Sequence, residues 1–590
     1  AIFKGTNTDL EHTLSDGALM IVKDGYAGPG AGSFAGGIAI QSLNMILNRA
    51  TILIQRNKAH TAGGGLTVVY GAMLRVSNES SVSVAYNTVN ALGAGMAILS
   101  ASVLTVNSGS TFSVYNNTIS LTSSGGGILV EASKVTVSGQ TTEMRLSGNV
   151  AGDGKAYIPG LGGGNFCMKL KSVMVVDDGA RLIIQDGRAP TCGGFMVDGE
   201  SNVTWTGGSR ISVQKNLATG VGTFGGGVHI SRGSVIYIEN KTTGLIAGNT
   251  AFSGGGMVIG TGESSGTSSG DNSSLVVRGV DTTVIVANNS ASSIAGGIFV
   301  WSSFSIQAGA SIDVHNNKAS ENCQGVYAQS SNALLTVSGV GTRMIVSHHR
   351  ATALDKNVGG LGIFGGTLII KDGGYLKSYK NMGQRGGGMY LSGAIVQIEG
   401  ARTRVVVQQN TAFVSAGGIL LFRGSQLRIR SGARLEVLNN TANSFGGGMS
   451  IYEKGAYLFT DGSDTSLVVS HNKARMGGGI ALMAGGVIRS TAPSFFMSNS
   501  ATQKSSGGMG YVAVGKNFGQ SNCVEIVLYI KSQTTSAVSI HTDPPSALHS
   551  DDKERIANQE SEWCLPCGDY TVHVGSFIVG QNFGPEGLVT

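Results

Sequence analysis

The sequence is poor in cysteine, proline and charged residues. Of 590 residues, 6 are cysteine, 8 are proline and 13% are charged. So few and such scattered cysteines exclude a disulfide framework as the basis of the fold. The net charge of +6 is slight for this length, and nucleic-acid binding would need a concentrated basic stripe with stacking aromatics. We therefore expect no nucleic-acid partner.

Long apolar runs and helical periodicity are also missing. No run approaches the roughly eighteen residues of a membrane helix, so we predict no direct membrane insertion. No segment spaces apolar residues by three and four over two or more turns, which excludes doubly wound and barrel α/β folds. The 92 glycines suit a chain with many tight turns.

A repeat of about 32 residues runs through most of the chain. Its sixteen copies share a consensus: an apolar residue, two variable residues, Asn, one variable residue, Ala, a short gap and a glycine run. The segments VLNNTANSFGGGMSI and VSHNKARMGGGIAL are two copies. Self-similarity at this period is typical of a solenoid, in which each unit covers its neighbours.

Each copy contains three segments of alternating apolar and polar residues, which indicate three short strands. One segment precedes the Asn, one follows the glycines, and one lies between them. We therefore predict an all-β fold, a right-handed parallel β-helix of about 16 three-stranded coils over residues 1–514. Residues 515–590 read as a C-terminal β-rich cap or the start of a further module.

The repeated Asn is predicted to be structural. Asn tolerates left-handed backbone, and stacked Asn amides can hydrogen-bond along the axis of a β stack. Gly25, Gly187 and His349 replace it in three copies. The predicted ladder consists of Asn57, Asn87, Asn117, Asn149, Asn216, Asn249, Asn289, Asn317, Asn381, Asn410, Asn440, Asn472 and Asn499.

The cysteines leave two pairings to consider. Cys523 with Cys564 or Cys567 is the favoured disulfide, and Cys167 with Cys192 is a second candidate from neighbouring coils. Cys564 and Cys567 form a single C-x-x-C without a second pair, which argues against zinc.

Seven N-x-S/T sequons are candidates for glycosylation, although a repeat rich in Asn, Ser and Thr also generates sequons by chance. Three of them lie one residue before the ladder Asn, in a slot that should face solvent. The seven are Asn78, Asn116, Asn202, Asn240, Asn272, Asn288 and Asn439.

No catalytic, cofactor-binding or metal-binding residues are predicted. The densest acidic group does not occupy equal phases of the repeat, and Asp favours turns. That group is Asp153, Asp177, Asp178, Asp186 and Asp198. A basic group could contact an anionic glycan or be a solvated face; it comprises Arg402, Arg404, Arg423, Arg428, Arg430 and Arg434.

Pairing an apolar-x-x-Asn element with a Gly-Gly-x-apolar element resembles the repeat of the polymorphic outer-membrane-protein family, whose units carry F-x-x-N and G-G-A-I/L/V. The resemblance covers about residues 20–511, with Phe496 the match to the family's Phe. It implies a right-handed β-helix on a cell surface, with adhesion as the usual role. Similar repeats occur in algal-like extracellular proteins, and the run from Cys564 to Thr571 resembles their C-L-P-x-G-x-Y-T segments.

Two functions follow from these observations. The first is a non-catalytic extracellular rod, adhesive or structural, serving as a subunit of a cell-surface appendage, filament or coat. Its partners would be other protein chains, with a glycan as a second class. The alternative is a carbohydrate-active β-helix protein that binds or cleaves polysaccharide.

Overall fold

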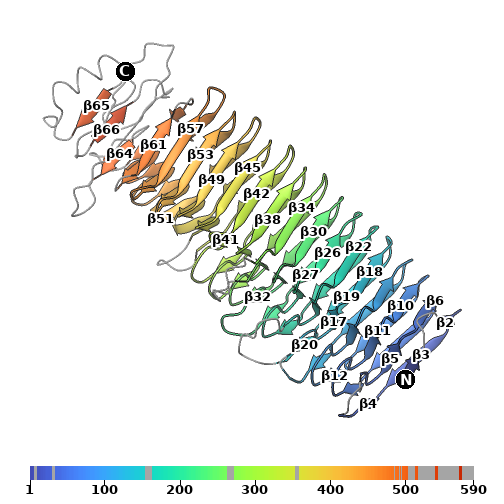
Figure 1. The fold of residues 1–590 in the computed structure, drawn as a ribbon. Helices are drawn as coiled ribbons and strands as arrows, with labels where there is room; N and C mark the ends of the chain where they lie inside the picture. Colours follow the sequence, from blue (N-terminus) through green and yellow to red (C-terminus); the bar gives the residue numbers. More distant parts are fainter. Residues whose placement is uncertain are drawn as a thin grey trace. The chain divides into compact units, whose positions relative to one another are not determined.

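Every regular element that the computed structural model describes is a β-strand (Figure 1). The described residues are 1–5, 10–29, 34–121, 123–152, 162–261, 271–351, 358–483, 486–490, 492, 494–497, 499–501, 512–515, 539–542 and 570–573. Over these ranges no helix is long and apolar enough to cross a membrane. The chain forms two compact units, Ala1–Ser305 with Gly309–Asp313, and Ile306–Ala308 with Val314–Thr590.

Each repeat copy forms one coil, and one coil of the first unit illustrates the pattern. Strand β9 (Leu66–Val69) follows the glycines, β10 (Met73–Ser77) and β11 (Ser81–Ala85) come next, and β12 (Thr88–Val89) follows the ladder Asn. Equivalent strands of successive coils build four parallel sheets, which we call A, B, C and D in this order. This coil therefore contains the three predicted strands and, in addition, a fourth strand of two residues.

In the first unit the four sheets begin at the first coil. Sheet A runs from β1 (Ile2–Lys4) to β37 (Ile298–Val300), and sheet B from β2 (Glu11–Ser15) to β34 (Ser274–Arg278). Sheet C runs from β3 (Leu19–Lys23) to β35 (Thr283–Ala287), and sheet D from β4 (Tyr26–Ala27) to β36 (Ser290–Ala291). Strands β38 (Ser303–Gln307) and β39 (Ser311–His315) contain residues of both units.

The second unit repeats this arrangement. Sheet A runs from β41 (Val326–Gln329) to β64 (Val512–Gly515), and sheet B from β42 (Leu334–Ser338) to β61 (Val487–Ser490). Sheet C runs from β43 (Arg343–Ser347) to β62 (Ser494–Met497), and a sheet in the position of D from β47 (Met382–Arg385) to β63 (Ser500–Ala501). Strand β64 also pairs antiparallel with β66 (Tyr570–His573), which pairs antiparallel with β65 (Ser539–Thr542).

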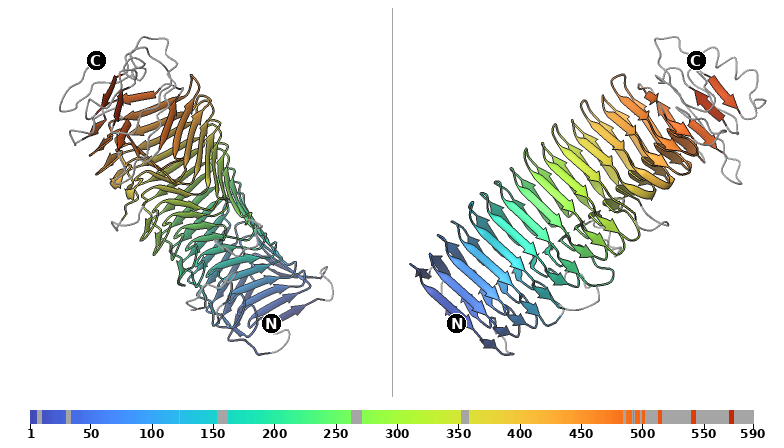
Figure 2. Two further views of the ribbon diagram at one scale, coloured as in Figure 1. Left: turned by 60° about the vertical axis from the view of Figure 1, so that its left-hand side comes forward. Right: turned by 180° about the vertical axis from the view of Figure 1, so that it is seen from behind.

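Within each unit the strands of successive coils stack in register (Figure 2). Leu74 of β10, for example, lies between Met45 of β6 (Asn44–Asn48) and Leu104 of β14 (Val103–Val106). In sheets B and C alternate residues point inward, so that Val82 and Val84 are fully buried. These inward columns form the core, and the predicted all-β parallel solenoid is confirmed.

Sheet A is covered on both faces in the first unit. Its outward side chains join an apolar layer with residues from the segment between the repeat's Ala and the next glycines. That layer contains Ala62, Val69, Ala97, Leu99, Leu129, Cys167, Cys192 and Met196. The variable gap of the repeat therefore folds back over sheet A, and the outward faces of sheets B and C are left to meet solvent.

Candidate functional site

The repeated Asn residues form a buried ladder in each unit. The backbone N–H of Asn57 and its Nδ2 donate to Oδ1 of Asn87, at 2.9 and 3.0 Å, and the same Nδ2 donates to the carbonyl of Val22. All thirteen predicted ladder Asn residues are at most 1% exposed. The ladder therefore joins coil to coil and offers no surface to a ligand.

The prediction that Asn is favoured at the ladder position because it tolerates left-handed backbone is wrong. The positive φ falls one residue earlier, at positions such as Arg56 (φ 55°), Tyr86 (φ 56°) and Lys215 (φ 54°). These residues have no special tolerance for that region. Asn is needed because one amide can accept from one coil and donate to the next, and the stacked strands impose the positive φ on whatever residue precedes it.

Asn165 is a ladder member that the repeat pattern does not predict. Gly187 has no side chain to continue the ladder, and Asn165 supplies one from the glycine run of a neighbouring coil. Nδ2 of Asn149 donates to Oδ1 of Asn165 at 2.8 Å, and Nδ2 of Asn165 donates to Oδ1 of Asn216 at 2.9 Å. At the equivalent position Gly65, an added Cβ would lie 2.7 Å from Nδ2 of the ladder residue Asn87. Asn165 fits because Gly187 leaves that space open.

His349 continues the ladder in the second unit with an imidazole. Its Nδ1 accepts from the backbone N–H of Asn317 at 3.2 Å, and Nε2 lies 3.0 Å from the carbonyl of Val314. These two contacts match the acceptor and the donor of an Asn amide, so the neutral Nε2–H tautomer fits. Burial lowers the pKa of His349 to about 4.

Replacing His349 by Asn should reduce the amount of stability that the protein loses as the pH falls from 7 to 4. The pKa of an unfolded histidine is about 6.5, so between pH 6.5 and 4 the unfolded chain binds the proton that the folded chain excludes. Stability is therefore full above pH 6.5 and falls as the pH drops toward 4. The His349→Asn variant should lose about 3 kcal/mol less than wild type between pH 7 and 4, measured by urea unfolding at both pH values.

The exposed His471 provides the matched control for this experiment. His471→Asn makes the same substitution on the surface, outside the ladder, so comparing the two variants isolates the effect of the buried position. Buried His229, whose pKa burial also lowers to about 4, leaves a residual slope in every variant. An unchanged slope in His349→Asn would contradict the assignment of a neutral, ladder-forming imidazole.

The described cysteines are buried free thiols. Cys167, Cys192 and Cys323 are all 0% exposed and unbridged, so the predicted Cys167–Cys192 disulfide is absent. In the register of sheet A, Cys167 of β21 (Phe166–Lys169) pairs with Met196, which places the two cysteines at different positions in the apolar layer. Burial raises the pKa of Cys323 to about 12. Cys523, Cys564 and Cys567 lie outside the described residues, and the pairing suggested for them stays a prediction.

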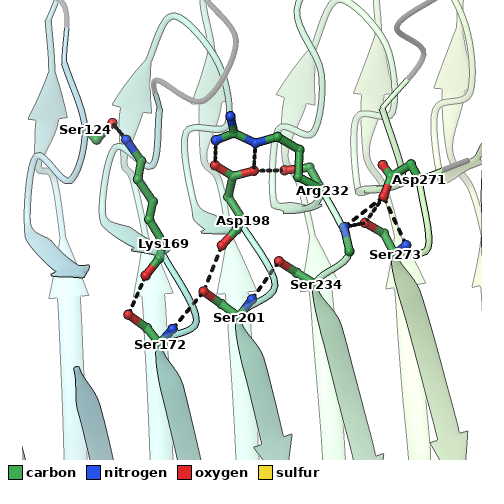
Figure 3. Close-up of polar contacts among 11 residues, drawn as sticks. Ser124, Lys169, Ser172, Asp198, Ser201, Arg232, Ser234, Asp271 and Ser273 are labelled. Carbon is green, nitrogen blue, oxygen red and sulfur yellow. Dashed lines mark hydrogen bonds and ion pairs between the residues drawn. The ribbon is translucent and has the colours of Figure 1, made fainter. Parts of the chain in front are cut away.

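Asp198 and Asp271 of the first unit each accept several hydrogen bonds from turns of neighbouring coils (Figure 3). Asp198 accepts from Ser231 Oγ at 2.8 Å, from Arg232 Nε at 2.6 Å and from Arg232 Nη2. Asp271 accepts from the backbone N–H of Gly233 and from both the N–H and the hydroxyl of Thr261 and of Ser273. Burial raises the pKa of Asp271, but these hydrogen bonds outweigh it and lower the pKa overall.

The other acids of the predicted group are separated from these two. Asp177 ends β22 (Val173–Asp177) in sheet B, where burial and then the charge of Asp178 raise its pKa. Asp186 has φ 55° and occupies the exposed slot before the ladder position, while Asp153 lies outside the described residues. In the part of the chain that the structure describes, no three His, Cys, Asp or Glu side chains group as metal ligands would.

The six arginines of the predicted basic group divide among different surfaces. Arg428 donates to Tyr457 Oη and Gln426 Oε1, and Arg430 pairs with Glu399 at 2.6 Å, all on sheet B. Arg423 follows β52 (Ile419–Phe422), with its guanidinium 5.1 Å from the Phe422 ring centre. Only Arg404 and Arg434 share a repeat phase, at the first residues of β50 (Arg404–Gln408) and β54 (Arg434–Leu438).

The outward face of sheet C in the second unit is rich in cations. We call it the basic face, and define it by the first, third and fifth residues of β43, β46 (Tyr375–Tyr379), β50, β54 and β58 (Ser466–Ser470). It carries four cations and one carboxylate. The cations are Arg343, Lys377, Arg404 and Arg434, and the carboxylate is Glu436.

Glu436 holds two of these arginines in place. Arg404 donates Nε and Nη2 to its two carboxylate oxygens at 3.0 and 2.8 Å, and Arg434 Nε lies 2.5 Å from Oε1. The Glu436 side chain is 5% exposed, whereas those of Arg404 and Arg434 are 51% and 53% exposed. One buried carboxylate therefore orients two exposed guanidinium groups, and the group of three keeps a net positive charge.

Tyrosines lie among the cations of the basic face. In register along sheet C, Tyr375 sits between Arg343 and Arg404. Nζ of Lys377 lies 4.4 Å from the ring centre of Tyr379, a cation–π distance. The face thus combines positive charge with half-buried aromatic rings, in columns that follow the strand stacking.

All seven sequon asparagines are exposed, as a glycan would require. Asn116, Asn288 and Asn439 occupy the slot before the ladder Asn, with φ between 54° and 56°. Nδ2 of Asn78 and of Asn240 donates to Asn48 Oδ1 and Thr206 Oγ1 on the preceding coils.

Comparison with known proteins adds little to this geometry. No family model and no curated protein matches the chain. Among solved structures, a TibC-catalysed hyper-glycosylated fragment of TibA matches with 11% sequence identity and a TM-score of 0.21, over 78% of this chain and 98% of that one. A TM-score this low carries no argument about function.

Proposed function

We propose that this chain is a non-catalytic extracellular β-solenoid with an adhesive or structural role at a cell surface. The observation that carries the proposal is the in-register display of side chains on the outward faces of sheets B and C. Such columns offer an open, repetitive surface suited to a large or repeating partner, whether another protein chain or a glycan. The exposed sequon asparagines support an extracellular setting, because N-glycans are added to surface segments of secreted proteins.

The acids of the first unit support the non-catalytic part of the proposal. A carboxyl group acts as a general acid or base only where it can exchange a proton with a substrate. Asp198 and Asp271 already accept several hydrogen bonds each from Ser, Thr, Arg or backbone donors. Their present role is to hold turns of neighbouring coils together.

Antibody labelling of intact cells from the source organism tests the location. We expect labelling without permeabilisation, and a decrease in the intact mass of the native protein after enzymatic removal of N-glycans. Labelling that requires permeabilisation would contradict an extracellular role. An unchanged mass would show that the sequons carry no N-glycan and therefore do not support the extracellular role.

A further inference from the structure

We propose that the basic face binds a linear acidic polysaccharide along the stacking direction of its strands. This inference deepens the proposed adhesive function and rests on it. It begins from a charge imbalance: four of the outward residues on β43, β46, β50, β54 and β58 are cations, against the single carboxylate of Glu436. An anionic partner complements such a surface.

Three of the four cations lie in one column that follows the stacking direction of the strands. Arg343, Tyr375, Arg404 and Arg434 are the first residues of four consecutive strands and are register neighbours. Neighbouring strands lie about 4.8 Å apart, so these four positions span roughly 14 Å. A polymer with an acid group on each sugar ring presents negative charges repeatedly along a line. The arginines of this column can pair with such charges.

Arg404 and Arg434 are oriented before any ligand arrives. Glu436 engages Nε and Nη2 of Arg404 and Nε of Arg434. Arg has five N–H donors, and the remaining donors of both groups have no protein partner among the described residues. Because Glu436 fixes the side chains, binding a carboxylate or sulfate costs less conformational entropy than it would at free surface arginines.

The tyrosines favour a sugar over a compact anion. Tyr375 lies within the arginine column, and Tyr379 lies beside Lys377 on the same strand. Aromatic side chains present an apolar body with a polar tip, which suits the apolar face and the hydroxyl groups of a sugar ring. Cations alone would suit any polyanion, so these rings are what direct the proposal to a polysaccharide.

The first unit contains a matched control pair. Arg181 and Arg210 are also register neighbours at the first positions of sheet C strands, and both are exposed. The third residues of their strands are Ile183 and Ser212, so no carboxylate stands at the position that Glu436 has on the basic face. Glu143, the register neighbour of Arg181 on the preceding strand, accepts from Arg145 Nε at 3.0 Å. Removing their charge tests long-range attraction alone.

The test measures binding of the purified full-length chain to sodium alginate, a polyuronate, with neutral dextran and duplex DNA as comparison probes. We expect alginate to bind, its affinity to fall as NaCl is raised, and dextran not to bind. The Arg343→Gln/Lys377→Gln variant and the Arg404→Gln/Arg434→Gln/Glu436→Gln variant should each lose at least tenfold in affinity. The Arg181→Gln/Arg210→Gln variant should change by less than twofold.

The triple variant neutralises Glu436 so that no buried carboxylate is left unpartnered, and circular dichroism checks that each variant is folded. The Arg343→Gln/Lys377→Gln variant removes no ion pair formed among the described residues, and it keeps the test valid if the triple variant fails to fold. No alginate binding by wild type, equal losses in the control pair, or tighter binding of duplex DNA would each overturn the proposal. Surface labelling of intact cells is independent of these results, so failure of this inference and failure of the proposed function are distinguishable.

Discussion

The Asn165→Gly variant should be less stable than wild type by about 4 kcal/mol, since Asn149, Asn216 and Gln185 each lose a hydrogen bond at once. Oδ1 of Asn165 accepts from Asn149, and its Nδ2 donates to Asn216 and, at 2.8 Å, to the carbonyl of Gln185. Among the described residues no other side chain links Asn149 to Asn216, because the ladder position between them is Gly187. Urea unfolding followed by circular dichroism measures the loss.

A double-variant cycle separates the ladder from simple loss of an Asn. Gly187→Asn alone should also destabilise, because its Cβ would lie 2.2 Å from the carbonyl oxygen of Gly193 and 2.4 Å from Nδ2 of Asn165, and the second contact is absent in the double variant. The combination Asn165→Gly/Gly187→Asn should be more stable than the sum of the single effects allows, since it rebuilds the usual arrangement of the repeat. Strict additivity would contradict this explanation. Asn78→Gly, at an exposed turn with φ 55°, is the control and should cost under about 1 kcal/mol.

Substituting Gly447 with alanine should cost about 3 kcal/mol by forcing coils apart. A Cβ at this position would lie 2.4 Å from the carbonyl oxygen of Gly478 and 2.5 Å from that of Lys473 on the next coil. Both contacts are with backbone, which cannot turn aside as a flexible side chain can. The thermal midpoint of the purified variant, followed by circular dichroism, measures the effect.

Gly424 is the control for Gly447. It has φ +73° and no atom within 4 Å of an added Cβ, so Gly424→Ala should cost only about 1 kcal/mol of left-handed backbone strain. Equal costs at the two glycines would show that the close approach of coils at Gly447 is not what requires glycine there.

The strands and the core of this fold were predictable because their signal is periodic. Alternating apolar residues, such as Val82 and Val84 in one copy, mark the inward columns in most copies, and the mean repeat length is enough to stack them. The two-residue strands of sheet D were missed because a segment such as β12 is too short to show any period. Pairing with the neighbouring coils, rather than local sequence, makes them strands.

The candidate site was only partly predictable. Arg404 and Arg434 were grouped with other arginines by distance along the chain, although β-strand register places Arg428 and Arg430 on sheet B. Sorting by repeat phase would have separated them, since Arg343, Arg404 and Arg434 each lie six residues before a ladder position. The role of Glu436 follows from side-chain geometry, which a sequence pattern does not contain.

The position at positive φ before each ladder residue accepts side chains of different chemistry without a change in the fold of the coil. Aspartate, arginine, tyrosine, lysine, histidine and asparagine all occupy it, at Asp24, Arg56, Tyr86, Lys215, His471 and Asn439. Their side chains lie outside the core, and the backbone bonds of neighbouring coils hold the conformation. A new charge, ring or attached sugar can therefore be introduced there copy by copy, so that lineages carrying this repeat can change what they present to their surroundings while inheriting the same scaffold.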